Sequence, residues 1–258
     1  MMWTPAQDLS KLASRWDLRG TALPRHVHRR KLAACKIASP KRSGSTALQA
    51  ALNAHPHTII RGENYNALRG LHAYVDAVAA AADRHNSGKP HHPWFGTARL
   101  DAPAVLADQR RHVIAHLLRP RADTRWSGFK EVRYEIGHFA DADVMTDYLL
   151  FINALLPGVR YVINVRDPQA AARSGWWREH PDAVTALERS VEHLRGAAGT
   201  LADVLGPGRV ALTEYEQWSA DPSIGVSALK NIGFPVQEAL IRESLSTHLE
   251  HGQNSERP

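Results

Sequence analysis

The stretch Leu32-Ala33-Ala34-Cys35-Lys36-Ile37-Ala38-Ser39-Pro40-Lys41-Arg42-Ser43-Gly44-Ser45-Thr46, with its continuation to Asn53, decides the fold of this chain. A strand-like apolar run over residues 32–38 enters a short polar loop, and a helix-like run over residues 46–53 leaves it. The first N–H groups of a helix lack partners within the helix, and the helix dipole favours negative charge at that end. The stretch therefore predicts a loop that binds phosphate or a similar anion at the edge of an α/β sheet.

The residue types in this loop suit an anion. Gly44 lets the backbone come close to a ligand, Ser45 and Thr46 offer hydroxyl groups, and Lys41 and Arg42 supply positive charge. An ordinary strand-to-helix turn, in which Ser45 or Thr46 caps the helix, is the alternative. The P-loop of nucleoside triphosphatases has a lysine after its glycine, whereas Ser45 follows Gly44 here, which argues against a kinase or an ATPase.

The composition is ordinary for a soluble globular protein, but the charge is basic. The chain has 258 residues, of which 43% are hydrophobic and 22% are charged, and its net charge is +6. This charge fits partners such as nucleotides, sulfated or acidic acceptors, nucleic acid and acidic lipid. The one dense basic run, residues 25–31, is interpreted as a solvated approach to the first strand, with contact to nucleic acid or a membrane as the alternative.

Cysteine content and hydropathy predict a cytoplasmic protein. Cys35 is the single cysteine of the sequence, which excludes an internal disulfide, and it lies in the apolar first strand. No apolar run reaches the length of a transmembrane segment, and the N-terminus lacks the charged-then-apolar pattern of a signal peptide. We therefore expect a soluble protein of a reducing compartment.

Strand-like and helix-like segments alternate along the chain. Strands are expected at 32–38, 58–60, 126–134, 158–166 and 209–213, and helices at 46–53, 65–83, 103–117, 143–156, after 168, 181–204, 221–231 and 236–247. The alternation predicts an α/β fold, a single domain with a central parallel sheet of about five strands flanked by helices. In this scheme residues 1–258 form one domain, with an N-terminal arm over residues 1–30 and an irregular tail over residues 248–258.

Polar residues gather where the predicted strands end. In chain order they are Lys41 to Thr46; Arg61, Glu63 and Asn64; Lys130, Glu131 and Arg133; Arg166, Asp167, Arg173 and Ser174; and Glu214, Tyr215 and Glu216. Ligands of parallel α/β sheets bind at the carboxyl ends of the strands. Positive groups dominate the central positions and carboxylates flank them, so this edge suits two anionic groups and a general base.

Several of these segments resemble the sulfotransferases that use 3′-phosphoadenosine 5′-phosphosulfate (PAPS). The run from Ser39 to Thr46, followed by His55-Pro56, looks like the loop that holds the 5′-phosphosulfate in that family. Arg166-Asp167-Pro168, with Ser174 eight residues after the arginine, resembles the family's 3′-phosphate site. Residues 129–133 and 215–222 are similar to two further segments of the family, so the resemblance extends over about residues 32–235.

The resemblance implies a P-loop-like phosphosulfate-binding loop and a set of roles. Cofactor-binding residues would be Lys41, Arg42, Ser43, Gly44, Ser45 and Thr46 at the 5′-phosphosulfate, and Arg166 and Ser174 at the 3′-phosphate. Arg42 would lie at the transferred sulfuryl group because its guanidinium is always charged and grips anionic oxygens, with Lys41 as the alternative. The chemistry requires no metal.

The acceptor hydroxyl needs a base within hydrogen-bonding reach. Glu63 is the first candidate, because glycosaminoglycan-type sulfotransferases resemble this chain in placing a catalytic glutamate shortly after the His-Pro. Its alternative role is a carboxylate in the first turn of a helix. Glu131 and Lys130 follow as catalytic candidates, with an ion pair at a strand end as their alternative. Three histidines are further possible bases for which a structural role is the alternative: His55, His57 and His138.

We therefore expect a sulfotransferase that transfers a sulfuryl group in line from PAPS to a hydroxyl of a carbohydrate, a lipid or a small molecule. A P-loop-like nucleotide-dependent kinase and a non-catalytic basic module that binds nucleotides or nucleic acid are the alternatives. Against a kinase, the sequence lacks the Gly-Lys-Ser/Thr motif and an obvious magnesium-binding carboxylate next to Thr46. Against a nucleic-acid-binding module, it lacks a basic stripe interleaved with aromatic residues. We expect no nucleic-acid partner, and the sequence does not indicate an oligomeric state.

Overall fold

A parallel sheet forms the centre of the computed structural model, which describes residues 32–84, 88–135 and 138–244. Its five strands lie in the order β2-β3-β1-β4-β5 and every neighbouring pair is parallel. They are β1 (Ala33–Ala38), β2 (Thr58–Arg61), β3 (Trp126–Glu131), β4 (Arg160–Val165) and β5 (Val210–Glu214). The predicted α/β fold is confirmed, whereas the predicted N-terminal arm at 1–30 and the predicted tail at 248–258 lie outside the described residues.

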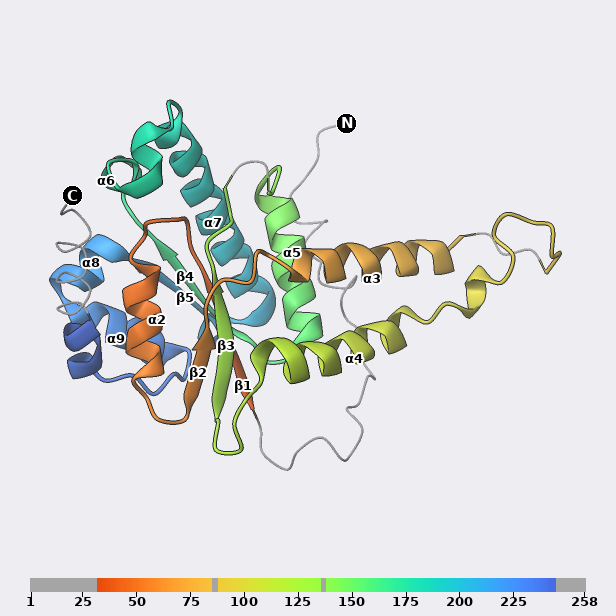
Figure 1. The fold of residues 1–258 in the computed structure, drawn as a ribbon, viewed down its shortest axis with the longest axis horizontal. Coiled ribbons are helices and arrows are strands. Elements are labelled where there is room, and N and C mark those ends of the chain that lie inside the picture. The colour runs from red at the N-terminus through yellow and green to blue at the C-terminus, as the bar shows by residue number, and fades with distance from the viewer. Residues whose placement is uncertain (1–31, 85–87, 136–137, 245–258) are drawn as a thin grey trace.

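Helices cover both faces of this sheet (Figure 1). On one face lie α2 (Ser45–Asn53), α8 (Tyr215–Ala220) and α9 (Pro222–Asn231), and on the other α5 (Ala142–Leu155) and α7 (Ala183–Leu205). The alternation of side chains along β1 serves both layers, because Cys35 and Ile37 pack with the first group and Ala34 and Ala38 with the second. This two-sided burial is why the central strands are almost continuously apolar.

The register brings the ends of the three central strands together. β1 pairs with β3 from Ala33↔Trp126 to Ala38↔Glu131, and with β4 from Cys35↔Arg160 to Ala38↔Ile163. The loop after β1 therefore emerges between the residues that follow β3 and those that follow β4. This edge of the sheet is the one at which the sequence places the polar residues.

Several boundaries differ from those expected, and the ends of β3 and α3 do so for a local reason. β3 ends at Glu131 rather than at residue 134, because the Glu131 carboxylate accepts the next two backbone N–H groups at 2.9 and 3.2 Å. Tyr65 and Asn66 have positive φ, so α3 (Leu68–Ala82) begins after them. α4 (Ala102–His112) continues as a π-helical turn, Val113–Leu118. The helix expected at 236–247 is present over residues 238–244, where the described chain ends.

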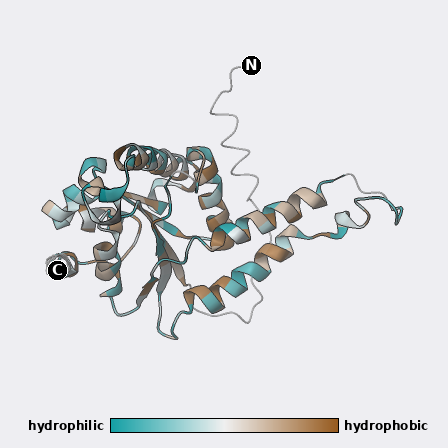
Figure 2. Ribbon diagram, turned by 45° about the horizontal axis from the view of Figure 1, so that its top comes forward, coloured by the Kyte–Doolittle hydropathy of each residue, from teal (hydrophilic) through white to brown (hydrophobic). Residues whose placement is uncertain are grey.

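α3 and α4 form a helical hairpin that projects from the body of the molecule (Figures 1 and 2). The buried residues of α3 are Leu68 and Val75, so its outer half contributes nothing to the core. The connection contains a short 3₁₀ turn, Thr97–Arg99. Across the described ranges, no helix combines the length and the apolarity needed to cross a membrane.

Lys36, in the middle of β1, is a fully buried cation. Its ammonium nitrogen lies 3.9 Å from the centroid of the Phe129 ring, and it has no hydrogen-bond partner within the described part of the chain. Burial lowers the pKa of Lys36 to about 7. The sheet therefore carries a group that costs stability when it is protonated.

Candidate functional site

The loop between β1 and α2 is fixed by buried hydrogen bonds to the sheet. Ser39 Oγ donates to the Asn164 carbonyl at 2.7 Å, and Asn164 Nδ2 donates to the Ser43 carbonyl at 2.7 Å. The hydroxyls of Ser39 and Ser43 also bond to each other. Asn164 Oδ1 accepts from Thr213 Oγ1 at 3.0 Å and Trp218 Nε1 at 2.9 Å, which ties the loop to β5 and α8. Sequence reasoning missed Asn164, although one amide in an otherwise apolar part of β4 was a signal.

Two residues of the loop adopt left-handed backbone conformations. Gly44 has φ 75°, and a Cβ there would lie 2.1 Å from a ring carbon of Tyr215, so only glycine fits under this ring. Arg42 has φ 65°, which costs a non-glycine residue about 1 kcal/mol. Arg166 Nη1 donates to the Arg42 carbonyl at 2.8 Å and thereby supports that conformation.

The N-terminus of α2 is open. Gly44 occupies the N-cap position, and no side chain of the described residues makes the capping hydrogen bond. The alternative in which Ser45 or Thr46 caps the helix is therefore wrong. Thr46 is exposed and Ser45 is buried, while the Ser43 hydroxyl is already bonded within the loop. Backbone N–H groups at such a helix end can bind an anion.

Arg42 links this loop to the end of β4. Its Nε donates to Ser174 Oγ at 3.0 Å, and its guanidinium lies against Gly175, where φ is 59°. Arg166 lies with its guanidinium carbon 4.7 Å from the centroid of the Tyr215 ring, and its Nε is 3.5 Å from Glu216 Oε1. The two predicted anion sites, the loop and the Arg166–Ser174 pair, therefore adjoin each other. α6 (Pro168–Ala172) connects Arg166 to Ser174.

On the other side of the loop, Lys130 bridges the helix end to a carboxylate. Its Nζ lies 3.3 Å from Thr46 Oγ1 and 3.1 Å from Glu63 Oε1. Arg133 Nη1 lies 3.2 Å from Glu63 Oε2. Glu63 is partly exposed and precedes α3, which begins at Leu68, so the alternative role in a first helical turn does not apply.

Glu131 is a buried anchor. Its Oε2 accepts the backbone N–H groups of Asn64 at 3.2 Å and Asn66 at 2.7 Å, and its Oε1 accepts those of Val132 and Arg133. Burial alone would raise the pKa of Glu131, but these hydrogen bonds and the nearby positive charge lower it below its usual value. The Arg133 guanidinium also pairs with it at 3.1 Å. The ion-pair alternative for Glu131 is thus confirmed, and Glu131 orients the loop on which Glu63 lies.

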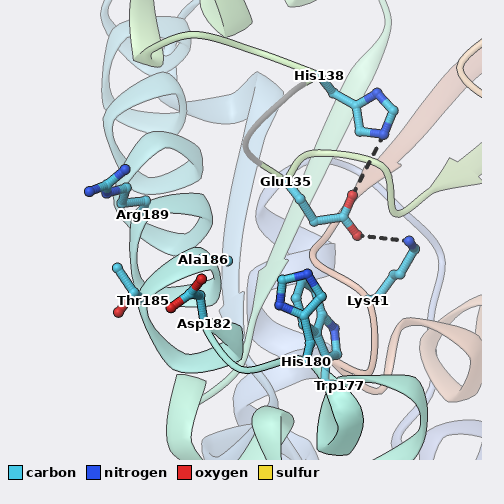
Figure 3. A pocket seen from close by; sticks show the side chains of 9 residues that line it. All are labelled: Lys41, Glu135, His138, Trp177, His180, Asp182, Thr185, Ala186 and Arg189. Carbon is cyan, nitrogen blue, oxygen red and sulfur yellow. Dashed lines mark ion pairs between the residues drawn. The ribbon is translucent and has the colours of Figure 1, made fainter.

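The side chains of Lys41 and Arg42 extend to different partners, Glu135 and Ser174. Lys41 Nζ lies 3.3 Å from Glu135 Oε1, at a pocket of about 570 Å³ (Figure 3). His138 Nε2 approaches the other oxygen of Glu135 at 3.8 Å. The pocket is lined by residues from the loop, the segment after β3, the 3₁₀ turn Gly175–Glu179 with its C-cap, and the start of α7: Lys41, Glu135, His138, Trp177, His180, Asp182, Thr185, Ala186 and Arg189. The sequence interpretation missed its Glu135 and Asp182.

The other two histidines considered as bases lie elsewhere. His55 and His57 precede β2, at the amino end of the strand, whereas Glu63 follows its carboxyl end. His57 Nδ1 lies 3.5 Å from Asp123 Oδ2, and His55 Nδ1 is 3.4 Å from Thr58 Oγ1. Their alternative, structural role fits this placement, and His138 alone of the three reaches the candidate site.

A family model decides the relationship of the chain to known proteins. The model described as the sulfotransferase family matches residues 36–234, which include every residue of the candidate site. The chain belongs to the sulfotransferase family. A search of curated protein sequences gave no significant match. The resemblance seen in the sequence is therefore confirmed at the level of the family.

One solved sulfotransferase domain has the same fold, and two other sulfotransferase structures match more distantly. The sulfotransferase domain from the Synechococcus PCC 7002 olefin synthase matches with a TM-score of 0.51 at 18% identity, over 85% of this chain and 78% of that one. A sulfotransferase from Alicyclobacillus acidocaldarius matches at 14% identity with a TM-score of 0.40, over 82% and 83% of the two chains. Sulfotransferase STF1 from Mycobacterium tuberculosis H37Rv matches at 16% identity with a TM-score of 0.42, over 93% and 76%.

Proposed function

We propose that this family member transfers a sulfuryl group from PAPS to a hydroxyl group of its acceptor. The observation that carries the proposal is the position of Lys130. Its ammonium touches both Thr46, at the open end of α2, and Glu63, the candidate base. One cation thus joins a place for an anion to a place for proton abstraction, as a transfer between two oxygens requires.

The donor fits the open helix end and the arginine cluster. The backbone N–H groups of residues 43–46 and the Thr46 hydroxyl would hold the 5′-phosphate, with Ser43 acting through its backbone because its hydroxyl is engaged. Arg42 would lie beside the sulfuryl group. Arg166 and Ser174 would hold the 3′-phosphate, which accounts for a serine and two arginines at an exposed strand end.

The reaction then follows from charge and proton balance. Glu63 takes the proton of the acceptor hydroxyl, whose oxygen forms a bond to sulfur as the bond from sulfur to the 5′-phosphate oxygen breaks. The products are the sulfated acceptor and adenosine 3′,5′-bisphosphate. Lys130 and Arg42 stabilise the negative charge that develops on the leaving oxygen and on the transferred group. Each Glu63 oxygen already contacts one cation and retains acceptor capacity for the hydroxyl.

The pocket at Lys41 is our candidate for the acceptor site (Figure 3). Two carboxylates, two imidazoles and a hydroxyl line it, so it suits a polar acceptor with several hydrogen-bonding groups. Lys41 would act there, on the acceptor, rather than on the donor. This assignment also explains why Lys41 turns to Glu135 while its neighbour Arg42 turns to Ser174.

Calorimetric titration with adenosine 3′,5′-bisphosphate tests the donor site. We expect tight binding by the wild type and a loss of about tenfold or more for Arg166→Ala and for Ser174→Ala. Arg242→Ala is the matched control, because this exposed arginine pairs with Glu238 on the C-terminal helix. No binding by the wild type would refute the proposal, and stabilisation by ATP with magnesium instead would favour a kinase.

Activity separates the base from the donor site. Glu63→Gln keeps the size of the side chain and removes its capacity to take a proton. We expect it to bind adenosine 3′,5′-bisphosphate about as well as the wild type and to lose about 10²–10⁴-fold in transfer rate. A Glu63→Gln variant that transfers at the wild-type rate would exclude Glu63 as the base.

A further inference from the structure

The hairpin tip, defined here as residues 88–101, exposes large apolar side chains. Trp94 and Phe95 are adjacent in sequence and are 40% and 52% exposed, and Leu100 is 43% exposed. Figure 1 shows this segment, in yellow, at the end of the hairpin farthest from the sheet. Isolated exposed apolar residues are common on protein surfaces, but a Trp-Phe pair at the far end of a projecting element calls for an explanation.

The hairpin cannot bury these residues itself. It is only two helices thick, and α3 has no buried residue beyond Val75. On α4 the buried residues, Ala102, Leu106 and Arg110, follow the tip towards the body of the molecule. The described chain therefore leaves about half of the surface of Trp94, Phe95 and Leu100 exposed.

The charge of the hairpin tip and the residues next to it is net positive. Residues 83–101 contain Arg84, Lys89 and Arg99 against Asp83 and Asp101, and the Asp101 carboxylate caps α4, where it accepts the Ala104 N–H at 2.9 Å. The guanidinium carbon of Arg84 lies 5.3 Å from the centroid of the Trp94 ring, so positive charge lies directly beside the exposed aromatic surface. A tip with this charge repels the same tip of a second copy and attracts a negatively charged partner.

We propose that the hairpin tip docks on an anionic lipid surface. Trp94 and Phe95 enter the headgroup region, where aromatic side chains are favoured, and the cations contact lipid phosphates. Each lysine or arginine close to such a surface strengthens binding about fivefold. A single-stranded nucleic acid fits less well, because Arg84 already lies over Trp94 and the projecting tip offers no groove along which a backbone runs. The inference is independent of the proposed transferase activity.

Co-sedimentation of the full chain with vesicles tests the proposal. The vesicles are pure phosphatidylcholine, or phosphatidylcholine mixed with phosphatidylglycerol. We expect binding only to the mixed vesicles, weakened by added salt. The affinity of the double variant Trp94→Ala/Phe95→Ala for the mixed vesicles should fall at least about tenfold. The affinity of Lys89→Gln should fall about fivefold. Tyr74→Ala is the matched control, since Tyr74 is an exposed aromatic residue on the shaft of the same hairpin, and it should bind as the wild type does.

The comparison of wild type with the variants decides the test, because the basic run at residues 25–31 is a second cationic segment that could also contact anionic vesicles. Equal sedimentation of wild type and the double variant overturns the proposal, as does failure of the wild type to bind the mixed vesicles. If the double mutation instead abolishes self-association in sedimentation velocity, or binding of single-stranded RNA, without any vesicle binding, the tip has a different partner and the proposal is wrong.

Discussion

Replacing the buried Glu131 by glutamine tests whether this side chain organises the catalytic edge. The carboxylate accepts four backbone N–H groups, two on each oxygen, and one bond from Arg133. Glutamine has the same shape but only one acceptor oxygen. Its amide nitrogen must therefore face one of the two N–H pairs, either that of residues 64 and 66 or that of residues 132 and 133.

The magnitude follows from the groups left without partners. Two N–H donors, one buried and one part-buried, lose their acceptor, at about 1–3 kcal/mol each. Among the described residues Arg133 pairs with two carboxylates, Glu131 and Glu63, and in the variant its ion pair with Glu63 remains. We expect the free energy of unfolding to fall by about 3–5 kcal/mol, which is the range for breaking a buried ion pair. Because Asn64 and Asn66 follow Glu63 closely, the transfer rate should fall further than the affinity for adenosine 3′,5′-bisphosphate.

Urea denaturation followed by tryptophan fluorescence measures this change. Glu238→Gln, an exposed glutamate paired with Arg242, is the control and should shift stability by less than about 1 kcal/mol. The folded-state pKa of Glu131 is lowered, so its contribution is present above the unfolded pKa and disappears as the pH falls through the folded value. Glu131→Gln should accordingly weaken the acid dependence of stability. A loss of less than about 1 kcal/mol at neutral pH would refute the reasoning.

Four other substitutions give three separate tests. Gly44→Ala places a Cβ 2.1 Å from the Tyr215 ring at φ 75°, so calorimetry should show weaker adenosine 3′,5′-bisphosphate binding and the melting temperature should fall; unchanged binding would contradict the packing. The pKa of Lys36 is about 7 in the fold, so the unfolded chain binds more protons between that pH and about 10. Stability should therefore rise with pH over this window, and Lys36→Met should remove the rise and stabilise the protein by a few kcal/mol at pH 7; a steeper rise in the variant would disprove this. Arg42→Ala should lose about tenfold or more in affinity for the bisphosphate, whereas Lys41→Ala should stay within about twofold, since Lys41 pairs with Glu135; the reverse order would return Lys41 to the donor site.

Local features of the chain were readable from the sequence. The β1–loop–α2 unit depends on neighbours in sequence: a buried strand, a glycine in a left-handed conformation and a helix start. Strand positions followed from apolar runs between turn residues, and parallel pairing placed their polar ends at one edge. These two facts together were enough to bring Arg42, Arg166, Ser174, Lys130 and Glu63 into one predicted site.

Interactions between distant segments were not readable. Asn164 and Ser43 are 121 residues apart, and nothing near either one shows that they bond. β3 ended early because Glu131 took the N–H groups that would have continued the strand. The apolar spacing of α3 predicted an amphipathic helix, but the spacing does not say what covers its outer half. Lys41 was named as the alternative to Arg42 at the sulfuryl group, and its ion pair with Glu135 could not be predicted because Glu135 is remote in sequence.

The contact of Tyr215 with Gly44 and the bond from Trp218 to Asn164 have a consequence for synthesis of the protein. The loop they support is translated early, whereas both aromatic residues leave the ribosome late. A nascent chain that ends before residue 210 contains every side chain that we propose binds the donor but lacks the two rings that hold the loop in place. Because a chain is made from its N-terminus, cofactor affinity should arise only when β5 and α8 dock, and ligand binding then marks the completion of folding.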